Sequence, residues 1–499
     1  MSNVIRATTT EGAQIEFVDK VIGQGGMKDV YFSPDRSYVV GFFRDQQDAQ
    51  AKDRLTTITG TYRDRIFNQA GGEYWKELFC WPSAVVEHNG RLGVVAPTYQ
   101  KHFFFEWGSR NDDFLCIKGK EKEGKWFASA SNQNRFLDLR ERGTWLNYLR
   151  ICILLARAVK RLHAAGLAHS DLSYKNCLVD PARGNASIID IDGLVVPGKF
   201  PPDVVGTPDF IAPEVVMTNH LSKHDPNRKL PCINTDRHAL AVLIYMYLLY
   251  RHPLRGDKVH HEDPQQDEML SMGANALFVE HPSDKSNRIK VQNVKQSELP
   301  WKDTSKTPYT VTGPYLVPLF KRTFINALHR PNDRPTADEW ETALVKTVDL
   351  IQPCQNLSCE QKWYVFDNST KPICPFCGTP YKGKLPVLNL YSSRKEGNYK
   401  PDNHRLMVYT NQSLFPWHVN RNVAPNERLT PEQKKRVGYF VLHNGSWWLV
   451  NEHLQDLMDV DSKVKIAIGD KVELKDGLKL LLSREDGGRL VIVQMVEGQ

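Results

Sequence analysis

Three oxygen-bearing side chains follow a long helical pattern in the middle of the chain, and their spacing constrains the fold most. Residues 145–165 repeat apolar side chains every three or four positions, which predicts a helix with one buried face. The next loop carries Asp171 and, five positions later, Asn176. A short apolar strand over 186–189 leads to Asp190. The helix, loop and strand therefore present an acid, an amide and a second acid in a fixed order.

Other signals flank this centre. Upstream, residues 21–31 predict a strand, a glycine turn and a second strand, in which backbone amides approach a phosphate without interference from Cβ atoms. Taken alone, this pattern also fits an ordinary glycine hairpin. Downstream lie Ala212-Pro213-Glu214, an apolar helix that begins at Asp236, and Arg334. The joint order of these signals is far more specific than any one of them.

This order resembles that of eukaryotic-like protein kinases over about residues 15–349. The resemblance implies an α+β, bilobal protein kinase-like fold, with the N-lobe over 1–99 and the C-lobe over 100–349. A polar insertion near 257–312 is expected to be a docking or disordered segment. Within it, His260 and His261 are expected to be solvated rather than to bind a metal.

The resemblance also implies a role for each polar residue of the centre. Asp171 is expected to orient the acceptor hydroxyl and accept its proton, while Asn176 and Asp190 hold Mg²⁺. Asp192 is an alternative metal ligand because the usual Asp-Phe-Gly is here Asp-Ile-Asp followed by glycine, but the spacing favours Asp190. The residues expected to bind ATP are Gly23, Gly25, Gly26, Lys28, Val30 and Arg44.

A cation is missing from the strand where protein kinases carry a lysine. No lysine occurs between Lys28 and Lys52, and the strand expected over 38–44 offers only Arg44. Lys28 stands in the place of the third loop glycine, which resembles the with-no-lysine kinases. That resemblance implies that Lys28 reaches the phosphates instead. Lys28 is therefore the predicted catalytic cation, with Arg44 as the alternative.

The sequence does not assign the acid that would pair with this cation. No glutamate occurs between Glu16 and Glu73, so an aspartate would have to take the place of the usual helix glutamate. Asp53 and Asp64 both lie in a plausible helix over 45–68. Neither residue type nor helical pattern decides between them.

This sequence lacks the residues that form the usual phosphorylation switch of protein kinases. Ser170 replaces the arginine that would receive a phosphorylated activation segment, and residues 193–206 contain no Ser, Thr or Tyr. We therefore expect constitutive or partner-controlled activity. Thr207 is expected to be a structural contact in a substrate-facing loop typical of Ser/Thr kinases, which favours Ser/Thr specificity.

Glu214 and Arg334 are predicted to form a buried ion pair.

Four cysteines predict a metal site within residues 350–385. Cys354 and Cys359 form one pair, and Cys374 and Cys377 form the second. This spacing fits a tetrahedral Zn²⁺ ribbon. Because sulfur fills all four positions and none is open for water, the zinc is expected to be structural. The five other cysteines are scattered singly and are expected to be reduced thiols.

Residues 386–499 predict a β-sandwich of short strands, including segments over 436–442, 445–451, 466–469 and 474–482. The order of Asn451, Gly469 and Asp476-Gly477 resembles a forkhead-associated domain, although a Ser-x-x-His motif is not evident. His418 and Arg421 are alternative phosphopeptide ligands, but we expect them to be exposed loop residues. Of the adjacent tryptophans at 447 and 448, one is expected in the core and the other on a contact surface.

Kinase, four-cysteine ribbon and forkhead-associated-like domain together resemble the kinase member of the bacterial TerY phosphorylation triad, which is linked to tellurite resistance. That resemblance implies transfer of the γ-phosphoryl group of ATP to a partner protein in a stress response. The implied partners are a von Willebrand A protein and a PP2C-type phosphatase. The alternative is a nucleotide-binding pseudokinase scaffold, because the strand lysine is absent.

Charge and hydropathy narrow the functions further. The net charge of +7 is spread along the chain without a basic run, so nucleic acid binding is not indicated. The longest apolar stretch, residues 239–250, is shorter than the roughly 20 residues that a membrane-spanning helix needs. The N-terminus has no apolar core followed by a cleavage site, so a cytoplasmic protein is expected.

Overall fold

The computed structural model describes residues 3–24, 27–68, 71–202, 206–222, 224–367, 369, 371–393, 395 and 397–498. The chain divides into two compact units. Unit 1 comprises Met1–Gly143, Asn147–Tyr309 and Pro318–Glu341, and unit 2 comprises Thr144–Leu146, Thr310–Val317 and Thr342–Gln499. Several limits between the units fall inside helices, such as 341/342 within the helix Ala337–Val348, whereas the sequence places a domain limit at 349/350. The predicted domain limits stay a prediction.

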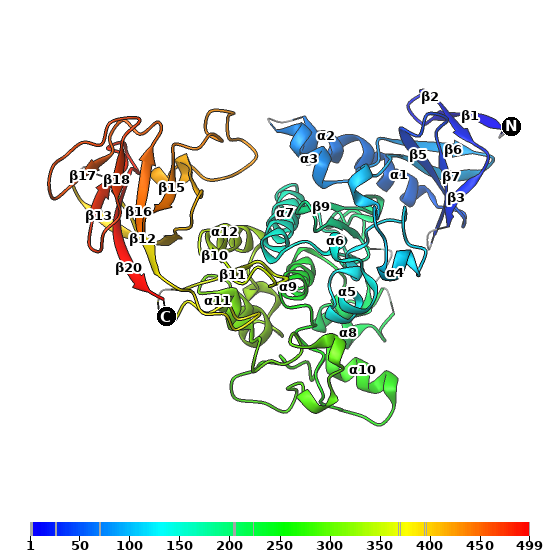
Figure 1. The fold of residues 1–499 in the computed structure, drawn as a ribbon. Coiled ribbons are helices and arrows are strands. Elements are labelled where there is room, and N and C mark those ends of the chain that lie inside the picture. The colour runs from blue at the N-terminus through cyan, green and yellow to red at the C-terminus, as the bar shows by residue number, and fades with distance from the viewer. Residues whose placement is uncertain are drawn as a thin grey trace. The chain divides into compact units, whose positions relative to one another are not determined.

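Unit 1 begins with a seven-stranded antiparallel sheet, drawn in blue in Figure 1, in the order β2-β1-β6-β7-β5-β4-β3. Apolar side chains alternate along the central strands, and Val40, Phe42, Val86 and Val95 form a small core on one face. The strands are β1 (Val4–Thr9), β2 (Gln14–Val18), β3 (Val21–Gln24), β4 (Lys28–Phe32), β5 (Tyr38–Phe43), β6 (Ala84–His88) and β7 (Arg91–Pro97).

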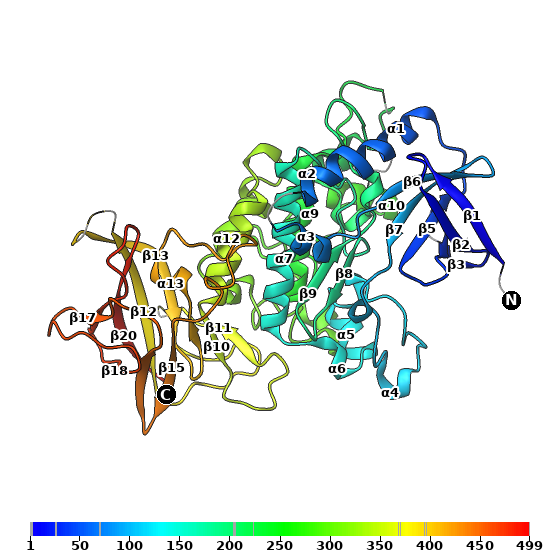
Figure 2. The ribbon, with the colours of Figure 1, turned by 90° about the horizontal axis from the view of Figure 1, so that it is seen from above.

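A helical segment follows β5 and returns the chain to β6. It contains α1 (Ala49–Thr57), the π-helix η1 (Ile58–Tyr62), α2 (Arg63–Phe67) and α3 (Gly72–Leu78). Asp48 caps α1 by accepting the Ala51 backbone N–H at 2.7 Å. Leu55 and Ile58 are buried, and α1 contacts β6, as the view from above also shows (Figure 2). The helical segment therefore packs against the sheet through its apolar positions.

The rest of unit 1 is mainly helical and contains one hairpin, β8 (Cys177–Asp180) with β9 (Asn185–Ile188). The two long predicted helices form as α7 and α9, and α9 is apolar on all sides because the protein surrounds it. The remaining α-helices, some of which extend into unit 2, are α4 (Arg110–Asp113), α5 (Ala130–Phe136), α6 (Leu139–Arg142), α7 (Trp145–Ala164), α8 (Pro213–Thr218), α9 (Ile233–Leu249), α10 (Pro264–Met272), α11 (Val317–Lys321) and α12 (Ala337–Val348).

Short helical turns connect these elements. The π-helix η9 (Arg322–Asn326) continues α11. The 3₁₀ helices are η2 (Lys101–Phe103), η3 (Gly124–Trp126), η4 (Ile191–Gly193), η5 (Pro208–Phe210), η6 (Val291–Asn293), η7 (Gln296–Glu298), η8 (Tyr309–Thr312) and η10 (Pro331–Asp333). Within the described ranges, no helix is long and apolar enough to cross a membrane.

The insertion over 257–312 is folded, so the expectation that it is disordered is wrong. Phe278 is buried, and its ring packs against those of Tyr245 and Phe324. Glu280 accepts hydrogen bonds from Tyr245 and, at 2.5 Å, from the buried guanidinium of Arg251. The charge of Arg251 would be costly to bury without a partner. Glu280, which belongs to the insertion, supplies the carboxylate that compensates it. A docking role for the insertion stays a prediction.

After the end of α12, unit 2 contains a small hairpin of β10 (Ile351–Pro353) and β11 (Trp363–Val365), followed by two antiparallel sheets. One sheet has the order β13-β12-β20-β19-β17 and the other β14-β15-β16-β18. Apolar side chains of both sheets belong to one core cluster. The elements are β12 (Lys384–Ser393), β13 (Tyr399–Met407), β14 (Ser413–Leu414), α13 (Pro416–Val419), β15 (Gly438–His443), β16 (Ser446–Asn451), β17 (Met458–Asp459), β18 (Lys471–Glu473), β19 (Lys479–Leu481) and β20 (Arg489–Glu497).

Unit 2 departs from the sequence expectations at two places. Residues 466–469 form no strand; Ile466 is buried, and its carbonyl accepts a hydrogen bond from the side chain of Asn451. His418 is buried and contacts Asp349 at 3.1 Å, so the expectation of an exposed loop residue is wrong for it. The prediction for the paired tryptophans is confirmed in its first half, because Trp447 is buried and donates to the Lys384 carbonyl.

Candidate active site

Asn176 connects the loop that carries Asp171 with the end of β9, after which Asp190 follows. Its Nδ2 donates to the backbone carbonyl of Asp171 at 2.8 Å and to the Asp171 carboxylate at 3.1 Å. The backbone carbonyl of Asn176 accepts the N–H of Ile189, the residue directly before Asp190, at 3.0 Å. Because the amide nitrogen faces Asp171, the amide oxygen of Asn176 points away from that acid. The structure therefore brings Asp171, Asn176 and Asp190 together, as their spacing suggested.

The loop that carries Asp171 is held from below by the first turn of α9. The Asp236 carboxylate accepts the backbone N–H groups of His169 at 2.7 Å and Ser170 at 3.3 Å. Ser170 has a φ of 68°, a left-handed conformation that is unusual for a residue with a Cβ. The buried carboxylate of Asp236 thus stabilises the turn at Ser170, although a serine does not favour this backbone conformation. The sequence indicates that a helix begins at Asp236, but its pattern does not predict this contact with the loop.

Lys28 reaches from β4 to the acids of the loop after β9. Its Nζ lies 2.5 Å from an oxygen of Asp192 and 3.7 Å from an oxygen of Asp190. The side chains of Lys28 and Asp192 are 18% and 10% exposed, whereas that of Asp190 is 53% exposed. Burial acts to lower the pKa of Lys28, but the two carboxylates outweigh it and raise this pKa above its usual range. The ammonium is therefore charged and faces both acids.

Arg44, the alternative cation, lies on the other face of the sheet. Its Nε is 4.0 Å from Asp29, which also accepts a 2.7 Å bond from Arg91. Asp29 follows Lys28 on β4, and successive side chains of a strand point to opposite faces. Val30 shares the face of Lys28 and pairs with Gly23 across the hairpin. Gly25 and Gly26 lie outside the described residues.

Neither helix aspartate is placed as the partner of Lys28. Asp53 is exposed and lies 3.4 Å from Lys199, and Asp64 is also exposed. Asp192 supplies the carboxylate instead, from the same loop as Asp190. The sequence predicts Asp192 only as an alternative metal ligand; the unusual Asp-Ile-Asp is the one signal that points to its contact with Lys28.

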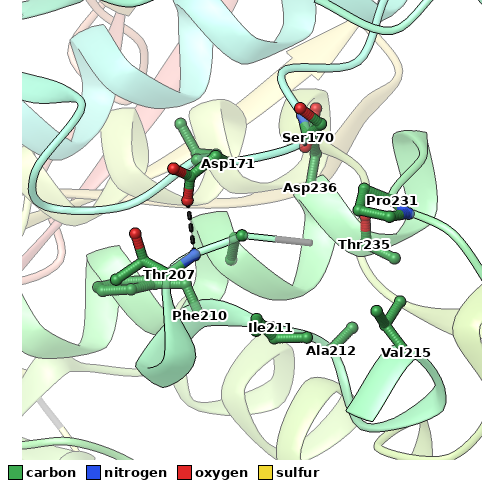
Figure 3. A pocket seen from close by; sticks show the side chains of 13 residues that line it. Ser170, Asp171, Thr207, Phe210, Ile211, Ala212, Val215, Pro231, Thr235 and Asp236 are labelled. Atoms are coloured by element: carbon green, nitrogen blue, oxygen red, sulfur yellow. Dashed lines mark hydrogen bonds between the residues drawn. The ribbon is translucent and has the colours of Figure 1, made fainter. Parts of the chain in front are cut away.

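Asp171 also borders a pocket, shown in Figure 3. Its carboxylate accepts the backbone N–H of Thr207 at 2.7 Å, marked by the dashed line, and the Thr207 hydroxyl lies 3.2 Å from that of Ser173. Thr207 is thus a structural contact here, as expected. The far side of the pocket is apolar and is lined by Phe210, Ile211, Ala212, Val215, Pro231 and Ala239.

The buried ion pair predicted between Glu214 and Arg334 is confirmed. Two parallel hydrogen bonds of 2.8 Å and 2.7 Å join the guanidinium to the carboxylate. The carbonyls of Asn234 and Leu328 accept further bonds from Arg334. This bidentate pair, with two further bonds from the same guanidinium to backbone carbonyls, holds α8 in place next to the pocket.

The four cysteines gather into one cluster in unit 2, where their sulfur atoms lie within 4.8 Å of one another. The Cys354 and Cys377 sulfurs are 3.5 Å apart, and those of Cys359 and Cys374 are 4.0 Å apart. A tetrahedral Zn²⁺ with bonds of ~2.3 Å separates its sulfur ligands by roughly 3.8 Å, whereas a disulfide needs ~2.05 Å. The donor set and its spacing therefore fit a four-coordinate metal.

Comparison with known proteins identifies the class of the central part of the chain. Residues 132–340 match the family model of the protein kinase domain. Death-associated protein kinase dapk-1 of Caenorhabditis elegans is 36% identical over 104 residues, which is 20% of this chain and 6% of that protein. Serine/threonine-protein kinase PknD of Chlamydia pneumoniae is 23% identical over 270 residues, which is 48% of this chain and 24% of that protein.

Over residues 132–340 the chain is thus similar to the protein kinase domain. It spans only a small part of these curated relatives. Among solved structures, a rhoptry kinase of Toxoplasma gondii is 15% identical with a TM-score of 0.39, over 70% of this chain and 84% of that chain. The matched residues include Asp171, Asn176 and Asp190, whereas Lys28 and unit 2 beyond residue 340 lie outside the match.

We expect Asp236→Ala to reduce the free energy of unfolding by about 2 to 4 kcal/mol, because two backbone N–H groups lose their acceptor. Urea unfolding of the full chain measures this change. Asp338→Ala serves as the control, since its ion pair with Lys160 is exposed and contributes little. A loss below about 0.5 kcal/mol in Asp236→Ala would contradict the anchoring role.

Proposed function

We propose that the protein is an ATP- and Mg²⁺-dependent Ser/Thr protein kinase that phosphorylates a partner protein. The observation that carries this proposal is the double connection of Asn176, to Asp171 by its side chain and to Ile189 by its backbone. It joins Asp171, which would serve the acceptor hydroxyl, to Asn176 and to the residue before Asp190. Asn176 and Asp190 together would supply oxygen donors to a metal. The match of residues 132–340 to the protein kinase domain supports the same conclusion.

The local charges fit a divalent cation beside Asp190. Partial burial and the neighbouring Asp192 carboxylate raise the pKa of Asp190, even though Lys28 is near. Two acids thus share one lysine, and negative charge remains in excess. Asn176 and Asp190 would hold Mg²⁺ through the hard oxygens that it prefers. When bound, Mg²⁺ would orient the ATP phosphates and neutralise charge on them.

The chain's own residues then have distinct tasks in the transfer. Asp171 would orient the acceptor hydroxyl and take its proton as the acceptor oxygen bonds to the γ-phosphorus and ADP leaves. Lys28 would neutralise phosphate charge from the sheet side, while Asp192 holds its ammonium in place. Gly23 and Val30 would flank the nucleotide on the same hairpin.

Partners and context extend the proposal on the basis of the sequence resemblance. A von Willebrand A protein and a PP2C-type phosphatase would accompany the kinase in a tellurite-resistance-associated stress response. Unit 2 would supply a zinc ribbon and a forkhead-associated-like β-sandwich. Phosphopeptide binding through His418 finds no support, because that side chain is buried against Asp349. Arg421 is half exposed and lies 3.1 Å from Ser392.

Phosphotransfer tests the proposal directly. With γ-labelled ATP, Mg²⁺ and dephosphorylated casein, we expect Asp171→Ala and Asp190→Ala to reduce the rate by about 10²-fold or more, since each removes a group needed for transfer. Asp19→Ala, an exposed residue of the sheet, should match the wild type. Equal labelling in the wild type and in both active-site variants would reject the kinase and favour the pseudokinase scaffold.

The cation is tested separately. Lys28→Met should raise the KM for ATP and lower kcat, because charge near the phosphates is lost. Asp192→Asn should shift the same parameters in the same direction, since it releases the ammonium. Arg44→Met should stay within about twofold of the wild type, because Arg44 faces away from the acids. Full activity of Lys28→Met would contradict this assignment.

Zinc content tests the cysteine cluster. The purified full chain should carry one zinc per molecule by elemental mass spectrometry, because four thiolates complete its coordination. Cys374→Ser should lose most of that zinc and lower the melting temperature, since metal binding contributes to folding. Cys116→Ser, at an exposed single cysteine, should change neither quantity. Stoichiometric zinc in Cys374→Ser would overturn the assignment.

A further inference from the structure

Backbone hydrogen bonds and one buried arginine hold the described residues that follow Asp190, up to residue 202. Residues 193–206 offer no hydroxyl for phosphorylation. Near the start of this segment, Val195 exchanges two backbone hydrogen bonds with Ala168, at 2.8 Å and 3.1 Å, just before the loop of Asp171. A turn then joins Val196 and Phe200 by two more bonds, at 3.1 Å and 2.9 Å. These bonds bring residue 201 to a defined place.

Arg54 reaches this place from helix α1. Its Nη2 donates to the carbonyl of Pro201 at 2.8 Å, and its guanidinium lies over the Phe200 ring, 5.8 Å from the centroid. Arg54 is 4% exposed and Phe200 is 2% exposed. A cation buried to this degree is tolerated where hydrogen-bond acceptors and a ring face compensate its desolvation. The contact is therefore specific to this position of the segment.

A second contact between the same two elements is much weaker. Lys199 lies 3.4 Å from Asp53, but both side chains are more than half exposed. Solvent and salt screen such a pair, so it fixes little. Burial, rather than the number of charges, therefore singles out Arg54 as the residue that holds the segment against α1.

We propose that Arg54 is a positioning residue for the protein-substrate site: without any phosphate group, its contacts with Phe200 and Pro201 hold residues 193–202 and thereby support the contact of Thr207 with Asp171. Pro201 precedes Thr207 by six positions, and the Thr207 N–H is bound to the Asp171 carboxylate. Loss of the Arg54 contact frees the segment from one side. The pocket beside Asp171, which Thr207 helps to line, then loses part of its fixed wall.

This inference rests on the proposed kinase function for its kinetic consequence, whereas its structural consequence is independent of activity. Arg54→Met removes the donor and keeps an unbranched side chain. Arg54→Lys keeps one charged donor and should restore part of the effect. Lys52→Met removes an exposed charge from the same helix and serves as the matched control.

Hydrogen exchange measured by mass spectrometry on the full chain gives the structural readout. We expect peptides over 194–202 to exchange about tenfold faster in Arg54→Met, with α9 unchanged and with Lys52→Met like the wild type. The kinetic readout is a rise of about tenfold or more in the KM for casein, while the KM for ATP stays within about twofold. Arg54→Lys should lie between the wild type and Arg54→Met in both readouts.

Each outcome decides the proposal. Unchanged exchange over 194–202 in Arg54→Met overturns it, and so does faster exchange with an unchanged KM for casein. A rise in the KM for ATP equal to that for casein also overturns it, because this indicates general loss of structure. If the wild type transfers no phosphate, the kinase proposal fails, and faster exchange confined to 194–202 still supports Arg54 as the residue that holds the segment.

Discussion

The site depends most on the carboxylate of Asp236, which holds the loop of Asp171 from the first turn of a buried helix. Helix α9 is surrounded by protein along its length, so its position is fixed by packing rather than by local preference. A carboxylate near a helix N-terminus is favourable there, and this one is shared between two backbone N–H groups. The loop thereby inherits the rigidity of the core, although Ser170 takes a strained conformation.

Because Lys28 pairs with Asp192, the helices beside the sheet do not have to supply a carboxylate for this lysine. Because the acid comes from the loop after β9, the position of Lys28 does not depend on a helix carboxylate. Helix α1 is then free to present a different group, the guanidinium of Arg54, to the segment after that loop. Helix α1 thus presents a buried cation where the resemblance predicts an acid.

Much of this arrangement could be predicted from the sequence because it follows from local pattern or from spaced motifs. Helices α7 and α9 follow from apolar periodicity, and the Glu214–Arg334 pair follows from the order of motifs. The contact of Glu280 with Arg251 and that of Lys28 with Asp192 could not be predicted, since they join distant segments and each residue type is also common on surfaces. Residues 466–469 predict a short strand, but they form none, and Ile466 is the buried side chain there while Ile468 is exposed.

Unit 2 shows why an exposed site cannot be inferred from residue type alone. Burial acts to raise the pKa of Asp349, yet contacts with His418 and His404 hold it well below its usual range. Burial acts to lower the pKa of His404, whose Nε2 lies 2.6 Å from the acid. Both imidazoles are thus committed to one buried carboxylate, as hydrogen-bonding groups must be in such a core. A phosphopeptide would have to bind through accessible side chains, and Arg421, half exposed beside Ser392, is such a side chain.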